Sequence, residues 1–386
     1  MSDNSEKALL PAGMQDGLPP EAALEAAAST RLVSHFDAWG YGRVKPPLME
    51  FEENFLHGPG QAMADQTFRV QDPVSQRMLA LRPDMTLQVA RIAHSRLSNS
   101  PRPLRLAYSG QVVRVKGSQL RPERQFGQVG AELIGASGPA ADVEVILMAV
   151  DALGAAGVTG LSVDLGLPTL AATVTADCNL DTAQTRELRT ALNRKDSAGV
   201  NALGDGLGDA ATAALIGMLD AVGPAKDALA KLNAIDLPAA AAQQRADLGS
   251  VVDGILAAAP DVQLTIDPVE NRGFEYHSGV SFALFSRGVK GELGRGGRYE
   301  VSTGEDAEGA TGLTLFMDTV MQALPEAAPA KSVFLPWGTS AEQARTLRTE
   351  GWRTIAALTE TTDANAQAKR LNCTHLLEGN AVRELN

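Results

Sequence analysis

The chain has 386 residues, 44% of them hydrophobic and 21% charged, a balance that supports a sizeable core and excludes an intrinsically disordered protein. Its formal net charge of -12 argues against a broad nucleic-acid-binding surface, which would be basic. Without a run of 18 apolar residues or a signal-peptide pattern, we expect a cytoplasmic protein of two or three domains, and two isolated cysteines indicate neither a disulfide framework nor a zinc site.

The first predicted elements are a helix and a strand that contains prolines. Apolar residues recur every four positions in 21–39 and predict an amphipathic helix, which Gly40 ends. Segment 43–51 contains Pro46 and Pro47, which predict an edge strand or an extended arm because proline cannot donate to a central ladder.

Two short paired strands and a helix are expected next. The strands are 67–70 and 78–81, and the sequence RPDMT at 82–86 leads into the helix. The simpler interpretation of Asp84 or Thr86 is that one of them caps this helix and has no role in binding.

Segment 102–135 predicts the central antiparallel sheet, with two or three strands, at 104–108, 111–115 and 128–134, joined by a basic, polar turn. Because strand side chains alternate between faces, Gln128 and Glu132 share one face, and Arg114 on a neighbouring strand could supply the opposite charge. The pattern fits a sheet floor beneath a polar pocket. An ordinary sheet with one solvated face is the simpler interpretation of this strip alone.

The remaining chain predicts a helix at 140–153, a strand at 161–165 and an inserted, alanine-rich helical subdomain at 166–260. Helices are expected there at 182–193, 209–222 and 239–258. Strands resume at 262–266 and 271–285, followed by a glycine cluster at 291–300 that permits close backbone approach but is no dinucleotide fingerprint. Arg295 and Arg298 in this cluster could contact a ligand or be solvated.

The last predicted elements are a strand entering a helix at 309–324, a linker at 325–330 and a small α/β module at 331–386. The predicted domains are therefore a core in two parts, 1–165 and 261–325, the insertion at 166–260 and the module.

The order of these motifs resembles the class II histidyl-tRNA synthetase family along nearly the first 325 residues. The motifs are LPAGMQDGLP, RPDMT, QVVR with QFGQVGAELIG, NRGFEYHSG and GRGGRYE. The resemblance implies an α+β fold, an antiparallel sheet flanked by helices, and a dimer formed through the N-terminal helix and strand.

The resemblance also implies a histidine pocket. Asp84 and Thr86 fall where the family holds the substrate amino group, Arg114 where it meets a carboxylate, and Gln128 and Glu132 where it contacts the amino group and the imidazole. RGFEYH resembles the family's RGLDYY, with a histidine in place of the second tyrosine. The expected ligand-binding residues are Asp84, Thr86, Arg114, Gln128, Glu132, Arg272, Tyr276 and His277.

Two departures from the family pattern concern the ATP site. Lys116 stands where the family has a glutamate that helps to hold ATP, and Thr319 stands where it has the arginine that meets the phosphates. A positive charge opposite transferring phosphates is usually a large catalytic term, so these changes speak against an active synthetase. The C-terminal module is also shorter than the family's anticodon-binding domain.

This combination resembles the paralogous regulatory subunits of ATP phosphoribosyltransferase. The resemblance implies a chain without catalysis or cofactor of its own, which assembles with a short-form catalytic subunit for the first step of histidine biosynthesis and takes part in histidine feedback. It implies a homodimer within a hetero-octamer. A working histidyl-tRNA synthetase and a synthetase-like amino-acid or tRNA sensor remain alternatives, and the pocket is either vestigial or a working histidine site.

Overall fold

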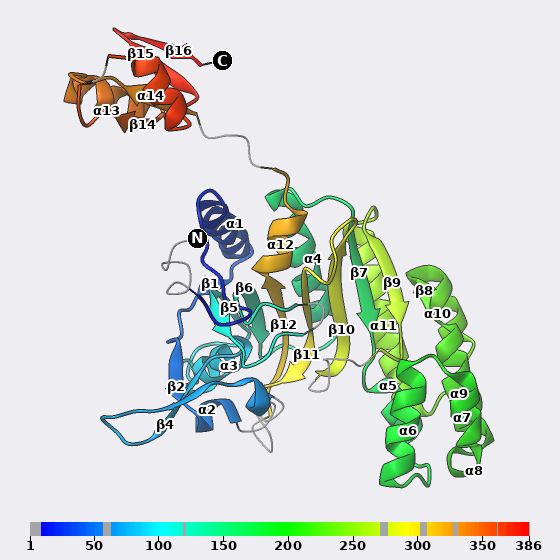
Figure 1. Cartoon of the computed structure of the whole chain (residues 1–386). Coiled ribbons are helices and arrows are strands. Elements are labelled where there is room, and N and C mark those ends of the chain that lie inside the picture. Colours follow the sequence, from blue (N-terminus) through cyan, green and yellow to red (C-terminus); the bar gives the residue numbers. More distant parts are fainter. Residues whose placement is uncertain are drawn as a thin grey trace. The chain divides into compact units, whose positions relative to one another are not determined.

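The computed structural model describes residues 9–56, 63–118, 121–270, 277–301, 307–326, 331–360 and 362–385. The chain forms two compact units, Met1–Pro325 and Glu326–Asn386 (Figure 1). No helix in these ranges is long and apolar enough to cross a membrane.

A nine-stranded sheet is the centre of the first unit, with strand order β1-β5-β6-β12-β11-β10-β7-β9-β8. Neighbours from β5 to β7 are antiparallel, whereas β1 pairs parallel with β5 and β9 parallel with β7. This is the predicted antiparallel sheet, with parallel pairs added near both edges. The strands are β1 (Gly42–Arg43), β5 (Leu104–Val113), β6 (Gln125–Ile134), β7 (Leu161–Gly166), β8 (Gly223–Pro224), β9 (Gln263–Asp267), β10 (His277–Ser286), β11 (Gly294–Glu300) and β12 (Gly309–Phe316).

Strand β5 decides between the two and the three strands expected in this segment. The expected strands 104–108 and 111–115 are one continuous strand, paired with β6 from Leu104 to Val113. Gly110 does not form a turn: a Cβ at this position would lie 2.4 Å from the Arg82 Nη2 atom, and Arg82 Nε donates to the Gln111 carbonyl at 2.7 Å. The glycine therefore makes room for a guanidinium beside an extended backbone.

Side chains of β6 alternate between the two faces of the sheet, as the sequence pattern predicts, and each face contributes to a hydrophobic core. Val129, Ala131 and Leu133 belong to the core that includes α1 and α4. Ile134 and Phe126 belong to the second core, beside α3. Figure 1 shows α1, α4 and α12 beside the sheet. These helices are α1 (Glu21–Ala38), α3 (Thr86–Ser95), α4 (Pro139–Ala156) and α12 (Met317–Ala323).

A small antiparallel sheet of order β2-β4-β3 carries the RPDMT segment on its exit from β4. The pairing of β3 with β4 confirms the short strands expected around 67–70 and 78–81. The elements are β2 (Met49–Phe51), α2 (Glu53–Leu56), β3 (Arg69–Gln71) and β4 (Met78–Leu81).

The chain forms seven helices between the end of β7 and the start of β9, and they are drawn in green in Figure 1. Predicted helices 182–193 and 239–258 are present with those bounds, and the one expected at 209–222 ends at Asp220. Their buried apolar residues continue the main core. The helices are α5 (Leu170–Val174), α6 (Thr182–Asn193), α7 (Ser197–Ala202), α8 (Gly204–Leu207), α9 (Asp209–Asp220), α10 (Ala225–Asn233) and α11 (Ala239–Ala258).

The second unit has a four-stranded sheet of order β14-β13-β15-β16. Strands β14, β13 and β15 are parallel and β16 is antiparallel to β15. The strand and helix alternation expected for this module is present. Its elements are β13 (Ser332–Leu335), α13 (Ala341–Thr349), β14 (Arg353–Ala356), α14 (Ala364–Arg370), β15 (His375–Glu378) and β16 (Ala381–Glu384).

Candidate functional site

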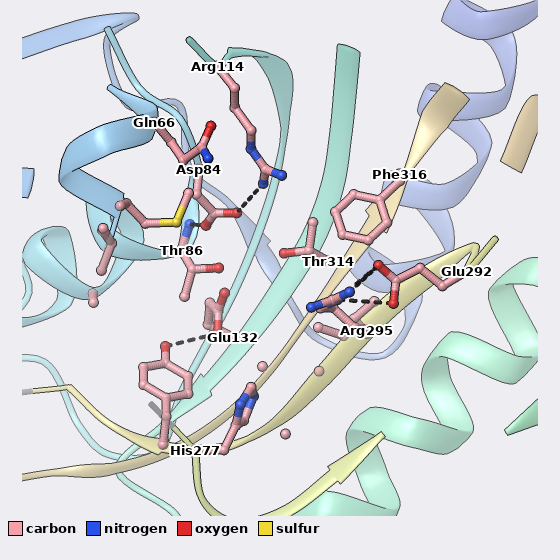
Figure 2. A pocket seen from close by; sticks show the side chains of 18 of the residues that line it. Gln66, Asp84, Thr86, Arg114, Glu132, His277, Glu292, Arg295, Thr314 and Phe316 are labelled. Atoms are coloured by element: carbon pink, nitrogen blue, oxygen red, sulfur yellow. Dashed lines mark hydrogen bonds and ion pairs between the residues drawn. The ribbon is translucent and has the colours of Figure 1, made fainter. Parts of the chain in front are cut away.

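A cavity of about 1210 Å³ lies in the first unit, between the start of α3 and one face of the central sheet. Figure 2 shows its lining side chains converging from both sides. Of the expected ligand-binding residues, the structure brings five to this cavity: Asp84, Thr86, Arg114, Glu132 and His277. Arg272 and Tyr276 lie outside the described residues.

Asp84 is fixed at the entrance to α3. Its Oδ1 accepts a hydrogen bond from the Thr86 backbone N–H at 2.8 Å. The helix-cap interpretation is nevertheless wrong, because the N-cap residue of α3 is Met85 and no side chain caps the helix. Its Oδ2 accepts from Gln128 Nε2 at 2.8 Å, and Gln128 Oε1 accepts from the Met85 N–H at 3.1 Å. Gln128 is fully buried behind Asp84, where it positions that carboxylate and is not among the residues that line the cavity.

Arg114 lies beside Asp84 in the cavity (Figure 2). The distance from its Nη2 to Asp84 Oδ2 is 3.9 Å, and its Nε donates to the Pro83 carbonyl at 3.1 Å. An acid and a guanidinium side by side match the two charges of an amino-acid zwitterion.

Glu132 is a fully buried carboxyl on the floor of the cavity. Tyr299 Oη donates to its Oε2 at 2.9 Å, and Tyr108 Oη to its Oε1 at 3.2 Å. Burial nevertheless raises the pKa of Glu132 to about 8, because removal from water disfavours the charged form. At neutral pH this carboxyl is therefore mostly protonated.

Two glycines make space for this arrangement. A Cβ at Gly312 would lie 1.7 Å from Glu132 Oε2, and one at Gly130 would lie 2.3 Å from the Tyr108 hydroxyl. The sequence shows where the glycines are, but it does not show which side chains of neighbouring strands pack against them. Sequence reasoning missed Tyr108 and Tyr299 for that reason.

Replacement of Gly312 with Ala is expected to displace Glu132 and to destabilise the fold by about 1–3 kcal/mol, since the added methyl overfills a packed site. Urea denaturation measures this cost. Gly154→Ala in α4 is the matched control, because a Cβ there has no neighbour within 4 Å and alanine favours helix by about 0.5–1 kcal/mol. Equal effects of the two changes would contradict the proposed packing of Glu132.

The opposite side of the cavity holds residues that the sequence analysis missed or left open. Arg121 lies over the Phe316 ring, 3.8 Å from its centroid, and pairs with Asp318 at 2.7 Å. Arg295 lines the cavity and pairs with Glu292, whereas Arg298 pairs with Asp142 and is not among the lining residues.

Thr319, which the motif resemblance places at the position of the family's phosphate-contacting arginine, lines the cavity. Its hydroxyl donates to the Glu292 carbonyl at 2.7 Å, so the site has a neutral, internally bonded side chain there. Lys116 also lines the cavity, and it is exposed. Across the ranges listed above, no group of three or more His, Cys, Asp or Glu residues could hold a metal ion.

The fold and the pocket define a class II histidyl-tRNA synthetase-like protein. The family model described as histidyl-tRNA synthetase matches residues 13–320. A Bacillus halodurans structure described as an ATP phosphoribosyltransferase regulatory subunit/histidyl-tRNA synthetase has a TM-score of 0.80, 24% identity, and coverage of 94% of this chain and 96% of that one. Histidyl-tRNA synthetase from Nostoc has a TM-score of 0.77 and 17% identity over 96% and 91% of the two chains.

Sequence relatives narrow this class. A Rhodospirillum centenum protein is 54% identical over 378 residues, 98% of this chain and 96% of the relative. A Paramagnetospirillum magneticum protein is 52% identical over 385 residues, all of both chains. Both are named ATP phosphoribosyltransferase regulatory subunit, and the chain belongs to this family. The resemblance stated from the sequence motifs is confirmed.

Proposed function

We propose that this chain is a non-catalytic subunit that assembles with a short-form ATP phosphoribosyltransferase catalytic subunit, activates it and takes part in histidine feedback. The observation that carries the proposal is identity of 52–54% across almost the whole chain to proteins named as the regulatory subunit. In the proposed assembly the chain is a homodimer within a hetero-octamer that catalyses the first step of histidine biosynthesis.

The proposed feedback ligand is free histidine, bound in the cavity. Asp84, with the Thr86 hydroxyl beside it, would hold the ammonium group, and Arg114 would hold the carboxylate. Glu132 would contact the imidazole from the cavity floor. Feedback further requires that histidine favour one assembly state over another, because a ligand with equal affinity for both states shifts nothing.

Reconstitution tests the assembly role. The purified chain is mixed with a short-form catalytic subunit, and phosphoribosyl-ATP formation is followed with and without histidine. We expect little activity from either protein alone, activity from the mixture and inhibition by histidine. Activity of the catalytic subunit that is unchanged by this chain would contradict the proposal. Histidine-dependent ATP–pyrophosphate exchange by this chain alone would instead favour a synthetase.

Calorimetry tests the ligand separately. Asp84→Asn is expected to weaken histidine binding roughly tenfold or more, because the ammonium group loses a charge-assisted hydrogen bond. Asp72→Asn, in the exposed turn between β3 and β4, removes the same charge away from the cavity and should bind like the parent. Absence of binding heat in the parent chain would contradict the proposed histidine site. It would not bear on the assembly role, which the reconstitution experiment tests.

A further inference from the structure

Three guanidinium groups, those of Arg114, Arg121 and Arg295, line the cavity. Arg114 and Arg121 each lie 5.1 Å from the centroid of the Phe126 ring. Burial lowers the pKa of Arg114, and the charges of Arg121 and Arg295 lower it further. Such a group of arginines would ordinarily attract a phosphate-bearing ligand.

Each of these arginines faces a carboxylate of the same chain. Arg114 lies 3.9 Å from Asp84, and Arg121 Nε donates to Asp318 Oδ2 at 2.7 Å. Arg295 Nε lies 3.0 Å from both carboxylate oxygens of Glu292, a pair drawn in Figure 2. The three positive charges are therefore matched by three negative ones.

The Arg121 and Arg295 pairs are partly shielded from water. The side chains of Arg121 and Asp318 are 12% and 13% exposed, and those of Arg295 and Glu292 are 31% and 17% exposed. Charges at such positions are less screened by salt than charges on an open surface. A carboxylate held there acts on a ligand in the cavity as well as on its arginine.

We propose that Glu292 and Asp318 are specificity residues that make the cavity reject phosphate-bearing ligands. Like charges juxtaposed in a site disfavour the wrong ligand, and Glu292 lines the cavity beside Arg295. Asp318 is not among the lining residues, but it neutralises Arg121, which is. A zwitterion brings no net charge and meets no such cost. The cavity thus selects a net neutral ligand although it contains the arginines of an anion site.

This selection is a property of the cavity, and it does not depend on the regulatory role or on the identity of the zwitterion. Its test is a calorimetric titration of inorganic pyrophosphate into the full chain and into Glu292→Gln, Asp318→Asn and the double variant. We expect no measurable binding by the parent. Each substitution should make pyrophosphate binding measurable, through the loss of a negative charge near the ligand, and added salt should weaken that binding.

Glu123→Gln combined with Glu300→Gln is the matched control. These two carboxylates line the cavity, and their removal changes the net charge by the same amount but leaves the Arg121–Asp318 and Arg295–Glu292 pairs intact. Addition of Arg295→Gln to Glu292→Gln should abolish the gain of that single variant. An equal gain in the control, pyrophosphate binding by the parent, or no gain in a folded double variant would each overturn the proposal. If the double variant does not fold, the single variant Glu292→Gln replaces it, because the Arg295–Glu292 pair is the more exposed of the two. Absence of a gain in that variant would then overturn the proposal.

Discussion

Replacement of Glu132 with Gln is expected to increase the free energy of unfolding by about 3 kcal/mol at pH 7, because each unit of pKa shift corresponds to about 1.4 kcal/mol. Burial raises the pKa of Glu132 from 4.5 to about 8. Between these values the folded chain binds a proton that the unfolded chain has released, so the stability of the parent falls as pH rises. Gln remains neutral and avoids this loss.

Urea denaturation of parent and variant across the pH range measures this difference. It should vanish below about pH 4, grow until about pH 8 and then stay constant. Glu144→Gln is a control of opposite sign, since a hydrogen bond from Arg105 lowers the pKa of Glu144 and its loss can only destabilise near neutral pH. A pH-independent gain in Glu132→Gln would show that the carboxyl is not perturbed.

The same substitution should change how histidine binding depends on pH. If one proton is shared between Glu132 and the ligand imidazole, affinity is greatest between the pKa of the imidazole, about 6.5, and that of Glu132, about 8. Above that range both groups have lost their protons and the affinity of the parent falls. Calorimetry at several pH values should show that Glu132→Gln reduces the fall on the alkaline side.

Replacement of Arg298 with Met is expected to destabilise the fold by about 3–5 kcal/mol, the typical cost of removing one partner of a buried ion pair. Arg298 Nη2 lies 2.5 Å from Oδ2 of Asp142, whose side chain is 1% exposed, and Arg298 Nη1 lies 3.2 Å from Asp247. The guanidinium therefore joins β11 to both α4 and α11. The Thr311 hydroxyl, which donates to Asp142 at 2.7 Å, cannot neutralise the charge that remains.

Arg383→Met removes the partner of Glu378 from an exposed pair and should leave stability unchanged, as is usual for surface ion pairs. The cost of Arg298→Met should be smaller at pH 5 than at pH 8. Burial raises the pKa of Asp142, whereas the hydrogen bond and the charge of Arg298 lower it. Without the arginine the pKa of Asp142 rises further, so at low pH the carboxyl is protonated and no buried charge remains. A small cost with no dependence on pH would contradict the role of this pair.

Local patterns in the sequence determined much of the fold. Helix propensity and end signals were enough for α6 and α11, whose bounds match the prediction. Alternation was enough to assign the two faces of β6, since a strand with both faces in cores must keep one register. The motifs in family order placed Asp84, Thr86, Arg114, Glu132 and His277 in one site, and the structure brings these five to one cavity.

Tertiary structure decided what depends on partners distant in sequence. Gly110 lies inside β5, where the Arg82 guanidinium occupies the space that a side chain would need. The Arg121–Asp318 pair joins residues 197 positions apart, and the Arg114–Asp84 pair joins the segment after β5 to the segment before α3. Local periodicity contains no information on such pairs, because strand order and helix packing set which charges meet, and these contacts determine the electrostatics of the cavity.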